Sequence, residues 1–287
     1  MKFVVSSSEL LKHLATISGV IASNPIVPIL ENFLLELDEA NLTITASDMQ
    51  TVMMTEAQVE SSDKGSIAVP AKLLMETLRS LPEQPVSVNV DEESFGIELV
   101  TSNGRFKLAG ENPMDFPKAP DVKRNFSIDI DSNVLSAAIA NTIFATSTDD
   151  LRPAMTGVFV QVETDHTTFV ATDGHRLVRY RRDDVKSENA TSMILPRKAL
   201  MLLKSSLPSG DLPVKAEFSN SNAFFSFGNI KMICRLIDER YPDYENVIPQ
   251  NNPNQMKIGR AELLSTLKRI SIYSNKTTHQ IRLKVSG

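Results

Sequence analysis

The chain contains little cysteine, no tryptophan and no long hydrophobic run. Its one cysteine, Cys234, among 287 residues excludes an internal disulfide and a cysteine metal cluster. No stretch approaches the length of a transmembrane helix, and the apolar run near residue 5 is too short for a signal peptide. We therefore expect a soluble, cytoplasmic protein with no membrane partner, no metal and no cofactor.

Neither sign of charge dominates the composition. Lys and Arg number 30 against 35 Asp and Glu, which leaves a net charge of −5. This balance argues against a protein that simply coats nucleic acid, although a basic strip on one face remains compatible with it. The length and the 41% hydrophobic content predict two or more domains with buried cores.

The chain repeats itself at a spacing of about 125 residues. The segment "IAVPAKLLMETLRSLP" (67–82) returns as "MILPRKALMLLKSSLP" (193–208), and "ITASDMQ" (44–50) returns as "FVATDGH" (169–175). Two further landmarks keep the same order. We therefore expect two copies of one domain, at residues 1–123 and 124–252.

A third copy begins at residue 253 and does not finish. Residues 255–274 have the pattern of the two earlier domain starts, and residues 279–287 resemble a strand of the second copy. One amphipathic helix and one strand cannot bury their own apolar faces. We therefore expect residues 253–287 to be an incomplete third domain of a truncated chain.

Each copy also consists of two similar halves. In the first half, a strand at 2–5 leads into a helix at 9–21, with its N-cap among residues 6–8 and its apolar residues at helical spacing. Three alternating strands follow, and the second half repeats this order around a helix at 72–79. The pattern predicts an α+β fold of antiparallel sheets with a few helices on one side.

The stretch "FVATDGHRLVRYRR" (169–182) predicts a hairpin, because two alternating segments flank Asp173 and Gly174. The equivalent turn of the first copy, "SDMQ" (47–50), has neither Gly nor His. The turn thus belongs to the fold, whereas Gly-His-Arg is added to one copy. It is interpreted as a peptide-docking site, as a plain structural turn, or as part of a hydrolase that uses His175.

The hydrolase is the weakest of these interpretations. A nucleophile–base pair needs a nucleophile held by the fold, yet the sequence has no G-x-S-x-G elbow. The histidines are His13, His166, His175 and His279, and none pairs with another at metal-ligand spacing. We therefore predict no catalytic residue and no metal site.

Four segments together carry a family resemblance. They are "VATDGHRL" (170–177), "LPRKAL" (195–200), "RYPDYENVIP" (240–249) and "VPILENFLLEL" (27–37). They resemble the bacterial DNA polymerase III β subunit, the replication sliding clamp, and the similarity covers about two and a quarter of that family's three domains. The resemblance implies the DNA-clamp fold. In that family two chains form a ring whose helices surround duplex DNA, and partner peptides dock between the second and third domains.

The resemblance also implies function, partners and sites. It implies a non-enzymatic processivity factor, a homodimer when full length, that encircles duplex DNA of any sequence. Its protein partners would be the DNA polymerase III α subunit, the clamp loader and other proteins with clamp-binding motifs. The family's peptide pocket falls on Met155, Thr172, Gly174, His175, Arg176, Leu177, Pro242 and Val247. The family's DNA contacts fall on Lys72, Arg79, Arg152, Arg197 and Lys198.

The charge of the expected helices can be compared with this ring. Helices at 72–79, 197–204 and 260–269 each carry more basic than acidic residues, although the chain as a whole is acidic. A basic lumen with few contacts suits a ring that topology holds on DNA. Asn246 and Asn24 stand where the family often has basic residues. A non-encircling, peptide-binding scaffold of the same fold is the alternative.

Overall fold

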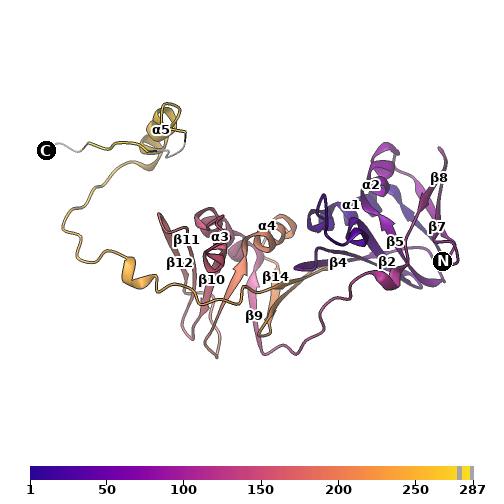
Figure 1. The fold of residues 1–287 in the computed structure, drawn as a ribbon, viewed down its shortest axis with the longest axis horizontal. Helices are drawn as coiled ribbons and strands as arrows, with labels where there is room; N and C mark the ends of the chain where they lie inside the picture. Colours follow the sequence, from indigo (N-terminus) through magenta and orange to yellow (C-terminus); the bar gives the residue numbers. More distant parts are fainter. Residues whose placement is uncertain (277–279, 285–287) are drawn as a thin grey trace. The chain divides into compact units, whose positions relative to one another are not determined.

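The computed structural model describes residues 1–276 and 280–284, and the chain forms two compact units, Met1–Tyr241 and Pro242–Gly287. The first unit contains the expected helices and strands of both copies, whereas residues 242–252, which we assign to the second copy, belong to the second unit (Figure 1). The elements of the first copy are β1 (Lys2–Ser6), α1 (Ser7–Ile17), β2 (Asn32–Asp38), β3 (Asn41–Ser47), β4 (Thr51–Gln58), β5 (Lys64–Pro70), α2 (Ala71–Ser80), β6 (Pro85–Val90), β7 (Gly96–Thr101) and β8 (Gly104–Ala109).

The second copy repeats this order, as the sequence predicts. Its elements are β9 (Phe126–Asp131), α3 (Ser132–Thr142), β10 (Gly157–Val162), β11 (Thr167–Thr172), β12 (Leu177–Arg182), β13 (Thr191–Pro196), α4 (Arg197–Ser206), β14 (Pro213–Phe218), β15 (Asn222–Phe227) and β16 (Ile230–Arg235). Short 3₁₀ turns follow α1 at Ser18–Val20 and α3 at Ile143–Ala145, and another lies at Pro153–Thr156.

The two halves of each copy exchange their first strands. β1 pairs with β6 and β5 pairs with β2, so each meander receives the leading strand of the other half. The second copy does the same, with β9 on β14 and β13 on β10. Every pairing is antiparallel, which confirms the predicted α+β fold of antiparallel sheets.

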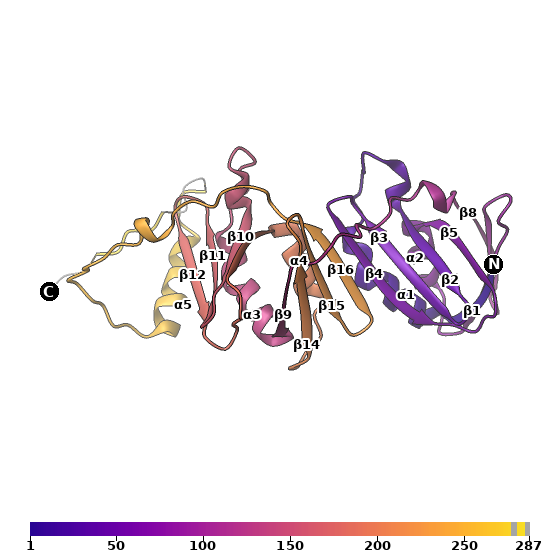
Figure 2. The ribbon, with the colours of Figure 1, turned by 90° about the horizontal axis from the view of Figure 1, so that it is seen from below.

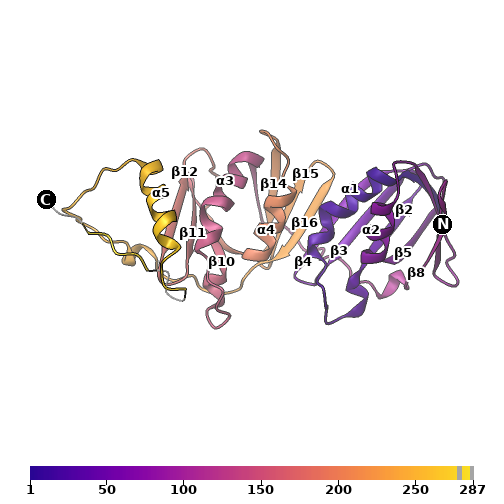
Figure 3. The same cartoon turned by 90° about the horizontal axis from the view of Figure 1, so that it is seen from above.

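One sheet runs through both copies. β4 pairs with β16, with Met53 opposite Met232, and the order β5-β2-β3-β4-β16-β15-β14-β9 forms a single sheet of eight strands. Helices α1 to α4 cover one side of the first unit, where they lie in front of the strands in Figure 3, while Figure 2 presents the strands from the opposite side. The helices are therefore on one side, as expected.

The helices bury an apolar stripe on the sheets. In α1 the stripe is Leu10, Leu14 and Ile17, each at most 1% exposed, and it packs on β3 and β4. Burying one such side chain contributes roughly 1.5–3 kcal/mol. The apolar cluster includes side chains of both copies, so the two cores are continuous across the β4–β16 junction.

The first helix ends earlier than predicted. We expect a helix to Ile21, but α1 ends at Ile17, and Ile21 has an extended backbone after the 3₁₀ turn. Gly19 lies in this turn, where an added Cβ would be 2.7 Å from Leu202 of α4. The backbone therefore approaches the second copy closely here, and a longer regular helix is not formed. Ser6 occupies the N-cap position, as predicted, but its side chain does not bond the helix backbone.

The second unit contains α5 (Arg260–Ser271) and a 3₁₀ turn at Glu245–Val247. The expected helix at 260–269 is thus present. Residues 280–284 form no strand, and the other residues of the expected strand, 279 and 285–287, lie outside the described residues. Within the part of the chain that is described, no helix is long and apolar enough to cross a membrane.

Candidate functional site: a hairpin turn and a basic helix face

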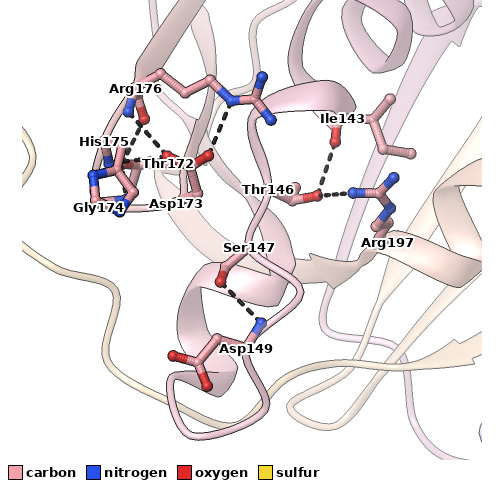
Figure 4. Close-up of polar contacts among 10 residues, drawn as sticks. All are labelled: Ile143, Thr146, Ser147, Asp149, Thr172, Asp173, Gly174, His175, Arg176 and Arg197. Carbon is pink, nitrogen blue, oxygen red and sulfur yellow. Dashed lines mark hydrogen bonds and ion pairs between the residues drawn. The ribbon is translucent and has the colours of Figure 1, made fainter. Parts of the chain in front are cut away.

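The β11–β12 turn is organised by one carboxylate. Asp173 Oδ1 accepts hydrogen bonds from the backbone N–H groups of His175 and Arg176, both at 2.9 Å, and Asp173 Oδ2 accepts from Arg176 Nε at 3.0 Å (Figure 4). Thr172 Oγ1 donates to the carbonyl of Arg176 and accepts from the N–H of Gly174. The turn is therefore rigid, and it presents the exposed side chains of His175 and Arg176 outward.

The electrostatics of Asp173 agree with this structural role. Its partial burial would raise the pKa of the carboxyl, but the N–H groups of Arg176 and His175 and the Arg176 guanidinium outweigh that effect and hold the pKa below its usual range. Asp173 is thus an anion that pairs with Arg176. In the hydrolase interpretation it would pair with His175, and the observed hydrogen bonds do not favour that arrangement.

The equivalent turn of the first copy has the same internal geometry. Asp48 Oδ1 accepts from the N–H groups of Gln50 at 3.0 Å and Thr51 at 2.6 Å, and Ser47 Oγ accepts from the N–H of Met49. Met49 has a φ of 72°, and Gly174 in the second copy has a φ of 87°. The turn is thus a property of the fold, as the sequence predicts.

A loop after α3 lies beside the second turn. Arg152 Nε donates to Asp149 Oδ2 at 2.9 Å within this loop, and a Cβ added to Gly174 would be 3.0 Å from Arg152 Nη1. The Arg176 guanidinium lies 5.7 Å from the ring centroid of Phe144, which is half exposed. The structure therefore brings Arg152, a predicted DNA contact, to the turn that carries the predicted peptide pocket.

The predicted pocket residues divide between the two units. Thr172, Gly174, His175, Arg176 and Leu177 share one hairpin, in which Thr172 pairs with Leu177, and Met155 lies in the 3₁₀ turn at Pro153–Thr156. Pro242 and Val247 belong to the second unit, where Val247 is 66% exposed. Their part in a common pocket stays a prediction.

The predicted DNA-contacting residues on the helices differ in their exposure and in the side chains that hold them. Lys72 and Arg79 lie on α2 and are exposed. Arg197, at the first position of α4, donates from Nη1 to Thr146 Oγ1 at 3.1 Å and is half-buried (Figure 4). Lys198 pairs with Asp48 of the first copy. Both predicted contacts on α4 are thus held by other side chains of the protein.

The histidines do not form a metal site in the described residues. His13 lies at the junction of the copies, His166 hydrogen-bonds Asp165 at 2.6 Å, and His175 is in the turn. No cluster of His, Cys, Asp or Glu suited to a metal occurs among the residues that the structure describes, and His279 lies outside them.

Comparisons with known proteins agree with this architecture. The family model for the DNA polymerase III beta subunit N-terminal domain matches residues 1–120, and the model for its central domain matches residues 129–243. The beta sliding clamp of Escherichia coli strain K12 is 30% identical over 288 residues, which cover 100% of this chain and 78% of the relative. The chain belongs to the DNA polymerase III beta subunit family.

Members of this family are sliding clamps, so the chain is a processivity factor of DNA replication. The beta sliding clamp of Vibrio cholerae is 29% identical over 100% of this chain and 78% of its own length. A Pseudomonas aeruginosa clamp bound to griselimycin superimposes with a TM-score of 0.89 at 27% identity, covering 97% of this chain and 76% of that chain. The Bacillus subtilis clamp, at 24% identity, shares the fold with a TM-score of 0.92 over 96% of this chain and 75% of its own.

Several residues around the site were not found by sequence reasoning. Phe144 is brought to the turn by its contact with Arg176, and Thr146 holds Arg197. Asp48 was recognised as part of a turn but not as a partner of Lys198. The repeat spacing is a signal in the sequence that points to Asp48, because it aligns Asp48 with Asp173, the carboxylate that pairs with a cation in the second copy.

Proposed function

We propose that the chain contributes two surfaces to a sliding clamp: a helix face that meets duplex DNA and the β11–β12 hairpin, where partner peptides dock. The hairpin carries this proposal. Its turn is closed by Asp173, so His175 and Arg176 are preorganised beside Phe144 and Leu177. A preorganised apolar and basic surface loses little entropy when it binds a peptide.

The DNA surface is made of Lys72, Arg79, Arg152, Arg197 and Lys198. The position of helices α1 to α4 on one side of the sheets supports it (Figure 3), as does the membership of a family named for its DNA polymerase. Sequence-independent binding of this kind arises from phosphate contacts and depends strongly on salt. The partners would be duplex DNA, the DNA polymerase III α subunit and the clamp loader, with a homodimer of full-length chains around the DNA.

The proposal includes two domains, at 1–123 and 124–252, the start of a third domain at 253–287, and no catalytic activity. A scaffold of the same fold that does not encircle DNA is the second candidate, because Asp149 and Asp48 neutralise two of the five predicted DNA contacts. None of the contacts in the described part of the chain supports a hydrolase that uses His175. The cytoplasmic location stays a prediction.

DNA binding is tested by the salt dependence of affinity for a labelled duplex of random sequence. Lys72→Gln and Arg79→Gln should each reduce the slope of log K against log salt by roughly 0.9, because each removes one phosphate contact. Lys231→Gln is the control, since Lys231 lies opposite Met54, on the sheet face away from α1. Wild-type slopes for both α2 variants would contradict a DNA surface on this helix.

Peptide docking is tested with griselimycin as the probe, by calorimetry. His175→Ala with Leu177→Ala should weaken binding at least tenfold, because the variant loses the apolar and polar contacts of the hairpin. Gln50→Ala is the matched control, since Gln50 is exposed at the same position of the first-copy turn. If the double variant binds with the affinity of the wild type, the hairpin is not the docking site.

A further inference from the structure

Lys198 connects the two copies. It lies in the first turn of α4, and its Nζ hydrogen-bonds and ion-pairs with Asp48 Oδ2 in the β3–β4 turn of the first copy. A second, longer contact of 3.4 Å joins Lys198 Nζ to the carbonyl oxygen of Val20. The Lys198 side chain is 52% exposed whereas that of Asp48 is 11% exposed. The lysine can thus leave this contact more easily than the aspartate can.

The repeat explains why Asp48 takes a cation from the other copy. In the second copy, Arg176 supplies the positive charge for Asp173 from within the same turn, at 3.0 Å. The residue at the position of Arg176 in the first copy is Thr51, which carries no charge. Asp48 Oδ1 is occupied by two backbone N–H groups, so Oδ2 is the oxygen available to Lys198.

A carboxylate oxygen and a phosphate oxygen present the same chemistry to an ammonium group. Both are anionic acceptors, and a lysine binds either as a point charge. A lysine that is paired with a carboxylate must give up that pair before it can neutralise a phosphate and release counterions from the DNA, so it adds little to the affinity. The two backbone N–H groups that donate to Asp48 Oδ1 also hold the carboxylate in place.

We propose that Asp48 competes with DNA phosphates for Lys198. Lys198 contacts DNA only when its ion pair with Asp48 is broken. This inference rests on the proposed DNA surface and adds a competitor within it. Asp48 thereby weakens one of the contacts between the clamp and DNA. Weak, exchangeable contacts allow a protein to move along the duplex.

The test replaces Asp48 by Asn, which keeps the Oδ1 acceptor of the turn and removes the charge. Anisotropy of a fluorescein-labelled random duplex is measured from low to moderate NaCl. Asp48→Asn should bind more tightly at low salt, and the slope of log K against log salt should steepen by roughly 0.9, equivalent to one more phosphate contact. In a Lys198→Gln background, the same substitution should change neither quantity.

A matched control separates this effect from a general change of charge. Glu56→Gln also removes one negative charge and one ion pair across the same junction, since Lys231 Nζ lies 2.8 Å from Glu56 Oε1. It should leave the slope unchanged. Circular dichroism reports folding, and Asp48→Ser, whose hydroxyl can also accept from the turn N–H groups, replaces Asp48→Asn if that variant does not fold.

The outcomes distinguish this inference from the proposed function. If Asp48→Asn leaves binding unchanged or weakens it while Lys72→Gln and Arg79→Gln reduce the slope, the DNA surface stands and the competition is overturned. If Lys198→Gln, Lys72→Gln and Arg79→Gln all keep the wild-type slope, the DNA surface itself is wrong. A steeper slope for Asp48→Asn that disappears with Lys198→Gln supports the competition.

Discussion

At the scale of single residues, the two equivalent turns use different residues for one strained backbone position. Gly174 has a φ of 87° and Met49 a φ of 72°, both in the left-handed region. A residue with a Cβ loses about 1–2 kcal/mol there, whereas glycine does not. The second copy has therefore relieved a strain that the first copy retains, and glycine also leaves room for Arg152.

Opposite effects on stability are expected from exchanging these residues. Gly174→Ala should lower the free energy of unfolding by about 1 kcal/mol or more, because it adds strain and a Cβ 3.0 Å from Arg152 Nη1. Met49→Gly should leave the free energy of unfolding unchanged or raise it by less than about 1 kcal/mol. The relief of backbone strain offsets the larger conformational entropy that glycine gives to the unfolded chain. Urea unfolding measures both, and equal losses for the two variants would contradict the argument.

At the scale of elements, α1 meets the β4–β16 pair through a half-buried polar side chain, His13. His13 Nδ1 lies 2.9 Å from Thr55 Oγ1 and 3.3 Å from Asn229 Nδ2, so side chains of both copies meet at this imidazole. The amide nitrogen of Asn229 can only donate, and Nδ1 is therefore the acceptor. Burial lowers the pKa of His13, and Lys12 adds to this effect while Glu9 opposes it.

The stability of this junction should depend on pH. Because the pKa of His13 is lower in the folded chain than its value of 6.5 in the unfolded chain, the stabilisation is present above pH 6.5 and is lost as the pH falls through the folded pKa. The wild type should therefore lose more unfolding free energy between pH 7.5 and 5.5 than His13→Gln. Urea unfolding at the two pH values measures this, and parallel losses would exclude His13 as the cause.

At the scale of the whole molecule, each unit is stabilised differently. Residues Met1–Tyr241 share one sheet of eight strands and an apolar cluster that continues through both copies. In the second unit, by contrast, α5 has no buried residue along its 12 residues. A helix of this length that buries no side chain gains little stability from packing and is marginal in water.

Unfolding should follow this division. The first unit should melt in a single calorimetric transition whose van't Hoff and calorimetric enthalpies agree, since the shared sheet couples the two copies. Amides of α5 should exchange with solvent much faster than those of α1, as measured by hydrogen exchange and mass spectrometry. Two resolved transitions within Met1–Tyr241 would show that the β4–β16 junction does not couple the copies.

Periodic patterns determined much of this fold. The strand–helix–meander order could be predicted in both copies because the apolar side chains alternate in strands and recur at helical spacing. The hairpin turn could be predicted from Asp173 and Gly174 because the backbone conformation there is local. The family resemblance added the candidate residues, but not their neighbours.

By itself the sequence determined the order of the helices and strands in both copies, the duplication and the family. The tertiary structure decided which strands pair, and it exchanged the leading strands between halves, because hydrogen bonds between strands form over distances that no local pattern encodes. It also decided that α1 ends at Ile17 and that Lys198 pairs with Asp48. Such contacts join residues far apart in the chain, and their geometry exists only once the copies are packed together.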